Sequence, residues 1–208
     1  MNSRTIITIG RQYGSGGRQI GRRIADELGV PFYDKELLAH AAQESGMPRE
    51  LFESYDEVPT NSLLYSLSMS AYSMGDMNSA TLNLPLNHKV FLAQTDAIKK
   101  LAERGGCVIV GRCADYALAR YPHLVNVFIY ADLKKRAARV AEYENISLRE
   151  AEGRALKTDK KRASYYNFYS NKKWGAMESY HLLVDSGAIN LDNTAKLILN
   201  FAEMKEPV

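Results

Sequence analysis

The sequence predicts an α/β protein whose parallel sheet is covered by helices on both faces. Three observations support this prediction: short apolar runs without alternation, helical patterns between them, and a glycine-rich turn directly after the first run. Runs that are apolar at every position are typical of strands buried on both faces, and their alternation with helices is typical of right-handed βαβ units. The expected strands lie at 5–9, 31–33, 107–110, 124–130 and 182–184.

Helical patterns fill the gaps between these runs. They are expected at 22–28, 35–44, 90–104 and 133–142, from 147 toward 156, and from about 192. Asp34 and Asp132 are predicted N-caps, and Ser147 with Glu150 fits a capping box. Gly105 is expected to end the third helix, because glycine readily adopts the left-handed conformation found after helices.

The size and composition are those of one globular domain. The chain has 208 residues, of which 46% are hydrophobic and 25% charged, and its net charge of +3 is too small to indicate a nucleic-acid binder by itself. Its two cysteines, Cys107 and Cys113, are too few for a disulfide scaffold and are expected to be buried thiols. The four histidines do not cluster in the sequence, so these residues predict no metal site.

The sequence also predicts where the protein resides. No apolar stretch is long enough to span a bilayer, and the N-terminal residues lack the apolar centre of a signal peptide. We therefore expect a cytoplasmic protein without a membrane partner.

Segment 59–89 breaks the alternation of strands and helices. It is rich in Ser, Asn, Met, Leu and Tyr and carries little charge. A flexible insertion is one interpretation, but so many apolar residues favour a packed helical subdomain or an oligomer contact. A homodimer that pairs through about 60–88 is therefore a further hypothesis.

The glycine-rich turn at 10–21 carries the first functional prediction. Four glycines within 14–21, after a strand and before a helix, favour a loop whose backbone N–H groups point at a phosphate. The alternative is a tight turn that needs glycine only for its positive φ values. The turn departs from the Walker pattern G-x-x-x-x-G-K-[ST], because Arg11 stands in the first glycine position and Gly17 in the lysine position. The nearest cation, Arg18, follows one residue later.

Charged residues after later strands could complete such a site. Arg112 follows Gly111 at the end of the third strand, where ligands of doubly wound sheets bind, and its guanidinium could donate two hydrogen bonds to one phosphate. The alternative is a surface arginine in a turn. Asp34 ends the second strand and could meet a substrate hydroxyl or a hydrated Mg²⁺, or serve only as a helix cap. Asp115 and Asp159 are secondary candidates.

Segment 157–174 mixes cations with aromatic residues. Its cations are Lys157, Lys160, Lys161, Arg162, Lys172 and Lys173. One interpretation is a mobile arm that closes over phosphates during phosphoryl transfer, which depends mainly on positioning and charge neutralisation. The alternatives are a solvated helix face and a single-stranded nucleic-acid site in which the aromatic rings stack on bases. The small net charge makes nucleic acid the least favoured partner.

In order and spacing, these motifs resemble those of the cytidylate kinase-like P-loop proteins, relatives of the nucleoside monophosphate kinases. The matching pieces lie at 6–21, 107–112, 127–139, 159–166, 174–175 and 180–187. The resemblance implies one P-loop kinase-like domain over 1–208, a three-layer α/β/α fold with a five-stranded parallel sheet of order 2-3-1-4-5. It also implies a helical insert at about 48–90, like a nucleoside monophosphate-binding region, and a lid at about 157–174.

The resemblance also implies a role for each candidate residue. The residues that would hold the donor phosphates are Gly14, Ser15, Gly16, Gly17, Arg18 and Gln19. The implied acceptor-binding residues are Arg112, Asp34, Lys157 and Lys161. The implied catalytic residues are Arg18, Asp34 and Arg162, of which Arg162 would stabilise the transferring phosphoryl group.

The activity implied by the resemblance is a kinase reaction with ATP and Mg²⁺. The γ-phosphoryl group of ATP would move to CMP or a related small phosphorylated acceptor. The chain departs from the family pattern at the loop lysine (Gly17), at the Mg²⁺-binding threonine (Gln19) and at the aspartate before Gly-Arg (Val110). Lys35-Glu36-Leu37 also stands where the family has Ser-Gly-Ala, and no Mg²⁺ ligand is assigned. The alternative hypothesis is therefore a nucleotide-binding sensor or partner module that has lost phosphoryl transfer.

Overall fold

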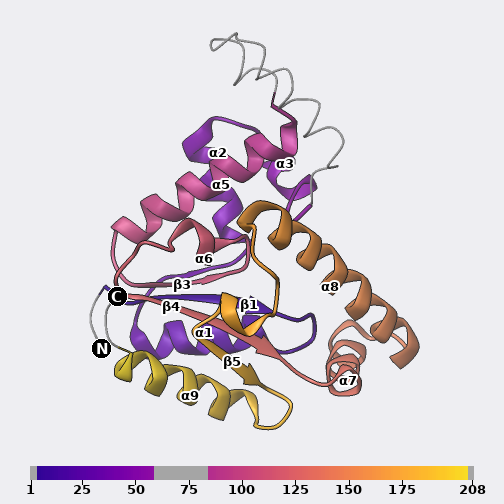
Figure 1. The fold of residues 1–208 in the computed structure, drawn as a ribbon. Helices are drawn as coiled ribbons and strands as arrows, with labels where there is room; N and C mark the ends of the chain where they lie inside the picture. The colour runs from indigo at the N-terminus through magenta and orange to yellow at the C-terminus, as the bar shows by residue number, and fades with distance from the viewer. Residues whose placement is uncertain (1–3, 59–83, 206–208) are drawn as a thin grey trace.

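Five parallel strands form one sheet in the order β2-β3-β1-β4-β5 in the computed structural model, which describes residues 4–58 and 84–205 (Figure 1). The strands are β1 (Ile6–Arg11), β2 (Phe32–Tyr33), β3 (Cys107–Val110), β4 (Leu124–Tyr130) and β5 (Leu182–Asp185). Every pairing is parallel, which confirms the predicted fold class and strand order. Because β1 lies between β3 and β4, its carboxyl end lies at the centre of the edge formed by the carboxyl ends of the strands.

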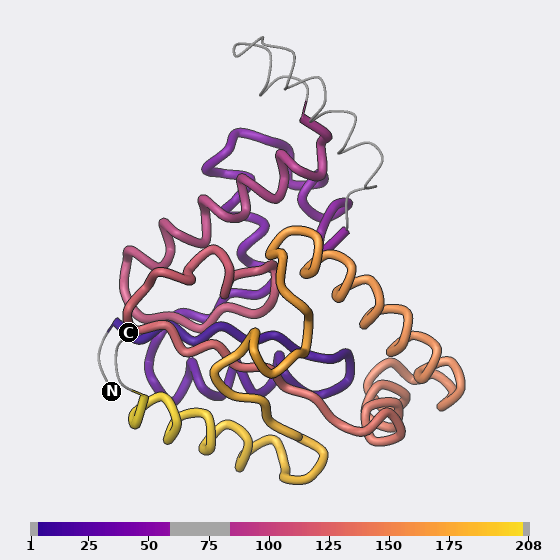
Figure 2. Tube along the Cα trace, in the orientation of Figure 1, coloured from indigo at the N-terminus to yellow at the C-terminus, as the bar shows by residue number. Residues whose placement is uncertain are grey.

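Helices cover both faces of the sheet (Figures 1 and 2). The helices α1 (Gly17–Leu28) and α9 (Leu191–Met204) cover one face. The other face is covered by α2 (Glu36–Ser45), α3 (Arg49–Ser54), α5 (Leu86–Glu103) and α6 (Ala114–Ala117). The remaining helices are α7 (Leu133–Glu144), α8 (Leu148–Ser170) and the short 3₁₀ helix η1 (Met177–Ser179).

The central strand β1 is anchored on both sides. Ile7 and Ile9 pack in the cluster with α1 and α9, whereas Ile6 packs in the cluster with α2 and α5. Successive residues of a strand point to opposite faces of the sheet. Because helices cover both faces, all three side chains are almost completely buried. Burial on both faces fixes the point at which the glycine-rich turn leaves the sheet.

A third cluster, formed by aromatic rings, holds the C-terminal half of α8 against the carboxyl edge of the sheet. The rings of Phe91 on α5 and Tyr169 on α8 stack with centroids 3.9 Å apart, and Tyr165 and Tyr166 pack in the same cluster with Phe128 of β4. The helix runs from α7 to α5 (Figure 1). It therefore lies beside the ends of the central strands.

The long helix α8 differs from the sequence prediction. The capping box of Ser147 and Glu150 and the cap at Asp132 are confirmed, but the helix continues past 156 to Ser170. The basic segment is therefore helical up to Ser170. Lysine, arginine and alanine favour helix at 160–163 and no proline interrupts the stretch, while packing of Tyr165, Tyr166 and Tyr169 holds the last turns. Asn171 ends the helix in the left-handed conformation with φ 54°.

Other boundaries differ less. Strand β1 continues to Arg11, and α5 begins at Leu86. Of the predicted insert at 48–90, the structure describes α3 and the start of α5, while residues 59–83 and most of the hypothetical dimer segment lie outside the described residues. Within the described chain, no helix combines the length and apolar character needed to cross a membrane.

Candidate functional site

The turn between β1 and α1 requires glycine at two positions. Gly14 and Gly16 have φ values of 77° and 81°, which side chains disfavour. A Cβ atom on Gly14 would lie 2.7 Å from the Arg136 carbonyl oxygen, and one on Gly16 would lie 2.5 Å from Leu191. Helix α1 then begins at Gly17, and no described side chain caps it. The N–H groups of its first turn have no partner within the helix and can bind an anion.

The carbonyl groups of this turn are held on the opposite side. The Ser15 hydroxyl donates to the Gln12 carbonyl at 2.8 Å, and the Ser186 hydroxyl donates to the Ser15 carbonyl at 2.6 Å. Arg139 donates to the Ser186 carbonyl at 2.7 Å and to the Gly14 carbonyl at 3.4 Å. Two N–H groups of the turn are also bonded within the protein: the Tyr13 N–H donates to Asp159 at 2.7 Å and the Ser15 N–H to the Gln12 carbonyl at 3.3 Å. Because the C=O and N–H of a trans peptide point in opposite directions, the bond from Ser186 to the Ser15 carbonyl directs the Gly16 N–H away from Ser186.

Asp159 fastens α8 to the same turn. Its carboxylate accepts the Tyr13 N–H at 2.7 Å and a guanidinium N–H of Arg136 at 2.7 Å. Burial raises the pKa of Asp159, and these two donors oppose the shift. Asp159 therefore has a structural role in this site, as a link between the helix and the loop.

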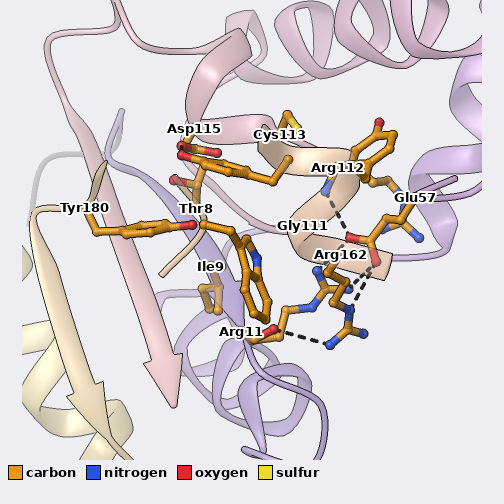
Figure 3. Close-up of a pocket in the computed structure, with 14 residues that line it drawn as sticks. Thr8, Ile9, Arg11, Glu57, Gly111, Arg112, Cys113, Asp115, Arg162 and Tyr180 are labelled. Atoms are coloured by element: carbon orange, nitrogen blue, oxygen red, sulfur yellow. Dashed lines mark hydrogen bonds and ion pairs between the residues drawn. The ribbon is translucent and has the colours of Figure 1, made fainter. Parts of the chain in front are cut away.

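Three arginines from different elements meet at the carboxyl ends of β1 and β3, as Figure 3 shows. Arg11 ends β1, Arg112 follows β3, and Arg162 lies on α8. The carboxylate of Glu57 lies between two of them, 2.7 Å from Arg11 Nη1 and 3.2 Å from Arg162 Nε. Burial alone would raise the pKa of Glu57, but the charges of Arg11 and Arg162 outweigh it and hold this pKa well below its usual range.

The Arg112 side chain is only 2% exposed. Its Nε and Nη2 each donate to one oxygen of Asp56 at 2.8 Å, and its Nη1 donates to Asp34 and to the Val110 carbonyl, both at 3.1 Å. The interpretation as a surface arginine is therefore wrong. The backbone at Arg112 has a φ of 54°, an uncommon value for a residue other than glycine.

Asp34 is not the helix cap that its position suggested. The N-cap of α2 is Lys35, without a capping side-chain bond. The Asp34 carboxylate instead accepts Arg18 Nε at 2.7 Å and Arg112 Nη1 at 3.1 Å. Burial favours a higher pKa for Asp34, but the charges of Arg112 and Arg11 and these two hydrogen bonds lower it overall. The two arginines thus override the local capping preference.

The predicted cations of α8 separate into two groups. Arg162 points into the cluster, and Lys161 Nζ donates to the Asp56 carbonyl at 3.0 Å. Lys157 is exposed on the same helix.

Two predicted phosphate-binding residues lie on α1. Arg18 is 58% exposed and directed toward Asp34, while Gln19 is exposed in the first turn of the helix.

A small pocket lies between the arginines and the aromatic cluster (Figure 3). Its walls include Thr8, Asp115, Tyr165, Tyr166, Trp174 and Tyr180. Asp115 accepts the Tyr166 hydroxyl at 2.7 Å, and burial raises its pKa. The pocket holds about 20 Å³, which suits roughly one water molecule. With Glu57 in place, it is therefore too small for a nucleoside.

Several residues of this site were missed by the sequence analysis. Asp56 and Glu57 belong to no motif, and their partners lie 46 to 105 residues away along the chain. Tyr180 has no predicted role in the sequence, where it is only the first residue of the segment 180–187 that matches the family. Arg11 did leave a signal, because it occupies a position where the Walker pattern has glycine. Among the described residues, no group of three His, Cys, Asp or Glu could hold a metal.

The sheet order, the glycine turn leading into α1 and the arginines at the strand ends define a protein of the P-loop kinase class. The chain belongs to the cytidylate kinase-like family, whose sequence model matches residues 6–188. It is 24% identical to the cytidylate kinase of Methanopyrus kandleri, over 93% of this chain and 90% of that protein. It is 25% identical to the cytidylate kinase of Methanothrix thermoacetophila, over 93% of this chain and 95% of that protein.

Solved structures agree on the fold. An uncharacterized protein from Eubacterium ventriosum superposes with a TM-score of 0.71 at 27% identity, over 97% of this chain and 99% of that one. A shikimate kinase from Bacteroides thetaiotaomicron superposes with a TM-score of 0.55 at 14% identity, over 96% and 99%. The second likeness bears on the fold alone.

Proposed function

We propose that this protein is a nucleoside monophosphate kinase-like phosphotransferase. It moves the γ-phosphoryl group of ATP to CMP or to a related small phosphorylated acceptor, with Mg²⁺. The observation that carries the proposal is the placement of the α1 N-terminus and of Arg112 and Arg162 at one edge of the sheet. The family membership and the two cytidylate kinases support it.

On the donor side, residues 14–19 bind the triphosphate of ATP. The two glycines with positive φ and the first turn of α1 fit such a group, because no side chain caps the helix and the N–H groups of its first turn lack partners within the helix. Mg²⁺, which neutralises charge on the phosphates, is held mainly by phosphates and water and needs only one or two protein oxygens. Asp34 is a poor candidate for such an oxygen, since both of its carboxylate oxygens already pair with arginines.

On the acceptor side, Arg112 binds the monophosphate. Its guanidinium already holds the Asp56 carboxylate through two parallel hydrogen bonds, the geometry with which arginine also binds phosphate. Asp34 orients Arg112 from the other side, and Lys161 and Lys157 add positive charge from α8. An acceptor phosphate therefore replaces Asp56 at Arg112.

The transfer itself depends on charge stabilisation. An oxygen of the acceptor phosphate attacks the γ-phosphorus while the bond to ADP breaks, and negative charge spreads over the transferring group. Arg162 acts on this charge, since it points into the cluster beside Arg11. Both guanidiniums bind the Glu57 carboxylate in this structure, so Glu57 must move when the phosphoryl group occupies that place.

A coupled assay of ADP release, run with ATP and a panel of nucleoside monophosphates and small phosphorylated acceptors, tests the proposal. We expect turnover with CMP or a close relative, and its loss in Arg112→Ala. Arg149→Ala, an exposed change at the start of α8, is the matched control and should retain activity. An absence of turnover with every acceptor, despite ATP binding, would reject the enzyme.

A second candidate is a nucleotide-binding sensor that has lost transfer. Gly17 and Gln19 favour it, since Gly17 replaces the lysine of the Walker pattern and Gln19 replaces the Mg²⁺-binding threonine of the family pattern. Calorimetry together with the ADP-release assay would separate the two candidates, because both bind ATP but the sensor shows no turnover.

A further inference from the structure

Two departures of the glycine turn from the Walker pattern compensate each other in space. Arg11 occupies the first glycine position, and Gly17 occupies the lysine position. A Cβ atom built on Gly17 would lie 2.7 Å from Arg11 Cβ and 3.1 Å from Arg11 Cγ. These distances are shorter than carbon–carbon contact allows. The chain can therefore carry a side chain at one of the two positions but not at both.

The Arg11 side chain passes over Gly17 and ends at the centre of the candidate site. It is 10% exposed, and its Nη1 packs so closely on Gly111 that a Cβ there would lie 2.2 Å away. The Arg11 guanidinium shares the Glu57 carboxylate with Arg162, which also donates to the Arg11 carbonyl at 3.3 Å. Two guanidiniums thus converge on one carboxylate, that of Glu57 (Figure 3).

Arg18, the cation next to the lysine position in the sequence, points elsewhere. Its Nε pairs with Asp34 at 2.7 Å, its Nη2 lies 3.8 Å from Glu36, and more than half of its side chain is exposed. It therefore lies toward α2, on the acceptor side of the site.

We propose that Arg11 supplies the cation that lysine supplies in the Walker pattern, and that position 17 is glycine so that this side chain can pass. The inference rests on the proposed function, and it replaces Arg18 by Arg11 as the cation for the donor phosphates. The Glu57 carboxylate marks the place that a phosphate of the donor takes between Arg11 and Arg162.

Four proteins test whether the cation can be moved from position 11 to position 17. They are wild type, Arg11→Gly, Gly17→Lys and the double variant Arg11→Gly/Gly17→Lys. Calorimetry measures their affinity for ATP with Mg²⁺, and the melting temperature without nucleotide monitors folding. Arg11→Gly should weaken binding at least about tenfold, the usual effect of losing a charged hydrogen bond. Gly17→Lys alone should also weaken it, because the new side chain meets Arg11. The double variant should bind more tightly than either single variant, since it restores the Walker arrangement.

Arg149→Ala, an exposed change at the start of α8, is the matched control and should bind ATP within about twofold of wild type. Recovery in the double variant separates a lost phosphate contact from a damaged fold, because a second change would not repair general unfolding. If Arg11→Gly binds like wild type, or if the double variant binds no better than Arg11→Gly, the inference is overturned while the proposed function stands. If wild type itself binds no ATP, both fail.

Discussion

The two sides of the candidate site are held in place by different forces. On the loop side, glycine packing and hydrogen bonds to backbone carbonyls fix the turn, as at Ser15 and Ser186. On the facing side, ion pairs between side chains connect Arg112 to Asp56 and Arg11 to Glu57. The first arrangement stays formed whatever binds. The second can exchange one anion for another, because phosphate makes the same bonds to a guanidinium as a carboxylate does.

This difference suggests how the site handles highly charged ligands. Arginines brought together without an anion would repel one another in a poorly hydrated place. Asp56 and Glu57 neutralise them in this structure, and under the proposed function phosphates take their place when substrates bind. We therefore expect changes on the loop side to act mainly through geometry, and changes on the facing side to act through charge, salt and pH.

The largest effect is expected on the charged side. Arg112→Ala removes the guanidinium that pairs with Asp56 and leaves Asp34 with Arg18 alone, and breaking a buried ion pair from one side costs about 3–5 kcal/mol. Chemical denaturation should show a loss of this size. Arg112→Lys should recover part of the stability but little acceptor affinity, because an ammonium cannot make the two parallel bonds. An unchanged free energy of unfolding would refute the buried network.

The next largest effect is expected on the loop side. Gly14→Ala combines an unfavourable φ with a contact of 2.7 Å to the Arg136 carbonyl, for about 2–4 kcal/mol of stability. Gly46→Ala is the matched control: it has a similar φ of 69°, and no described atom lies within 4 Å of its Cβ position. It should cost only the φ penalty of about 1–2 kcal/mol. Equal losses in urea titrations would contradict the close packing of the loop.

Glu57→Gln should lower stability and raise phosphate affinity together. It removes a charge that two arginines bind, at a cost of about 1.5–3 kcal/mol, and it removes the anion that competes with the phosphoryl group. Because the folded-state pKa of Glu57 lies below its ordinary value of 4.5, its stabilising contribution is present above that pH and is lost as the pH falls toward the lowered pKa.

Denaturation curves for wild type and Glu57→Gln should therefore converge as the pH is lowered below about 4.5. Calorimetry at neutral pH should show tighter ATP binding by the variant. Weaker binding by the variant would show that Glu57 assists the phosphates and does not compete with them.

The smallest effect is expected from a neutral bond of the loop. Ser186→Ala removes the 2.6 Å hydrogen bond to the Ser15 carbonyl, worth about 0.5–1.5 kcal/mol. The loss should be the same at low and high salt, since no net charge is involved, whereas the loss in Glu57→Gln should shrink slightly as salt increases, because its ion pairs are only 10–14% exposed. Thermal melts over a range of NaCl concentrations would check this, and a strong salt dependence for Ser186→Ala would remove the contrast between the two sides.

The sequence revealed the loop side better than the charged side for a physical reason. The apolar runs of the strands, the glycines with positive φ and the capping box at Ser147 are features of short stretches of sequence, so pattern alone predicts them. Asp34 shows where prediction from local pattern fails. The capping rule considers only neighbours in the chain, whereas Asp34 pairs with Arg112, 78 residues away. The Asp56–Glu57 pair has only distant partners and no motif. Arg11 could be recognised in the sequence as a departure from the Walker pattern. The direction of its side chain could not, because it depends on the contact with Gly17 in the folded protein.

A crystal structure of the protein with a non-hydrolysable ATP analogue and CMP would show where the donor binds. We expect the triphosphate against the backbone N–H groups of residues 14–19, with the Arg11 guanidinium on its terminal phosphates and Glu57 displaced. A triphosphate bound elsewhere, or Arg11 still paired with Glu57 while nucleotide fills the loop, would contradict this expectation.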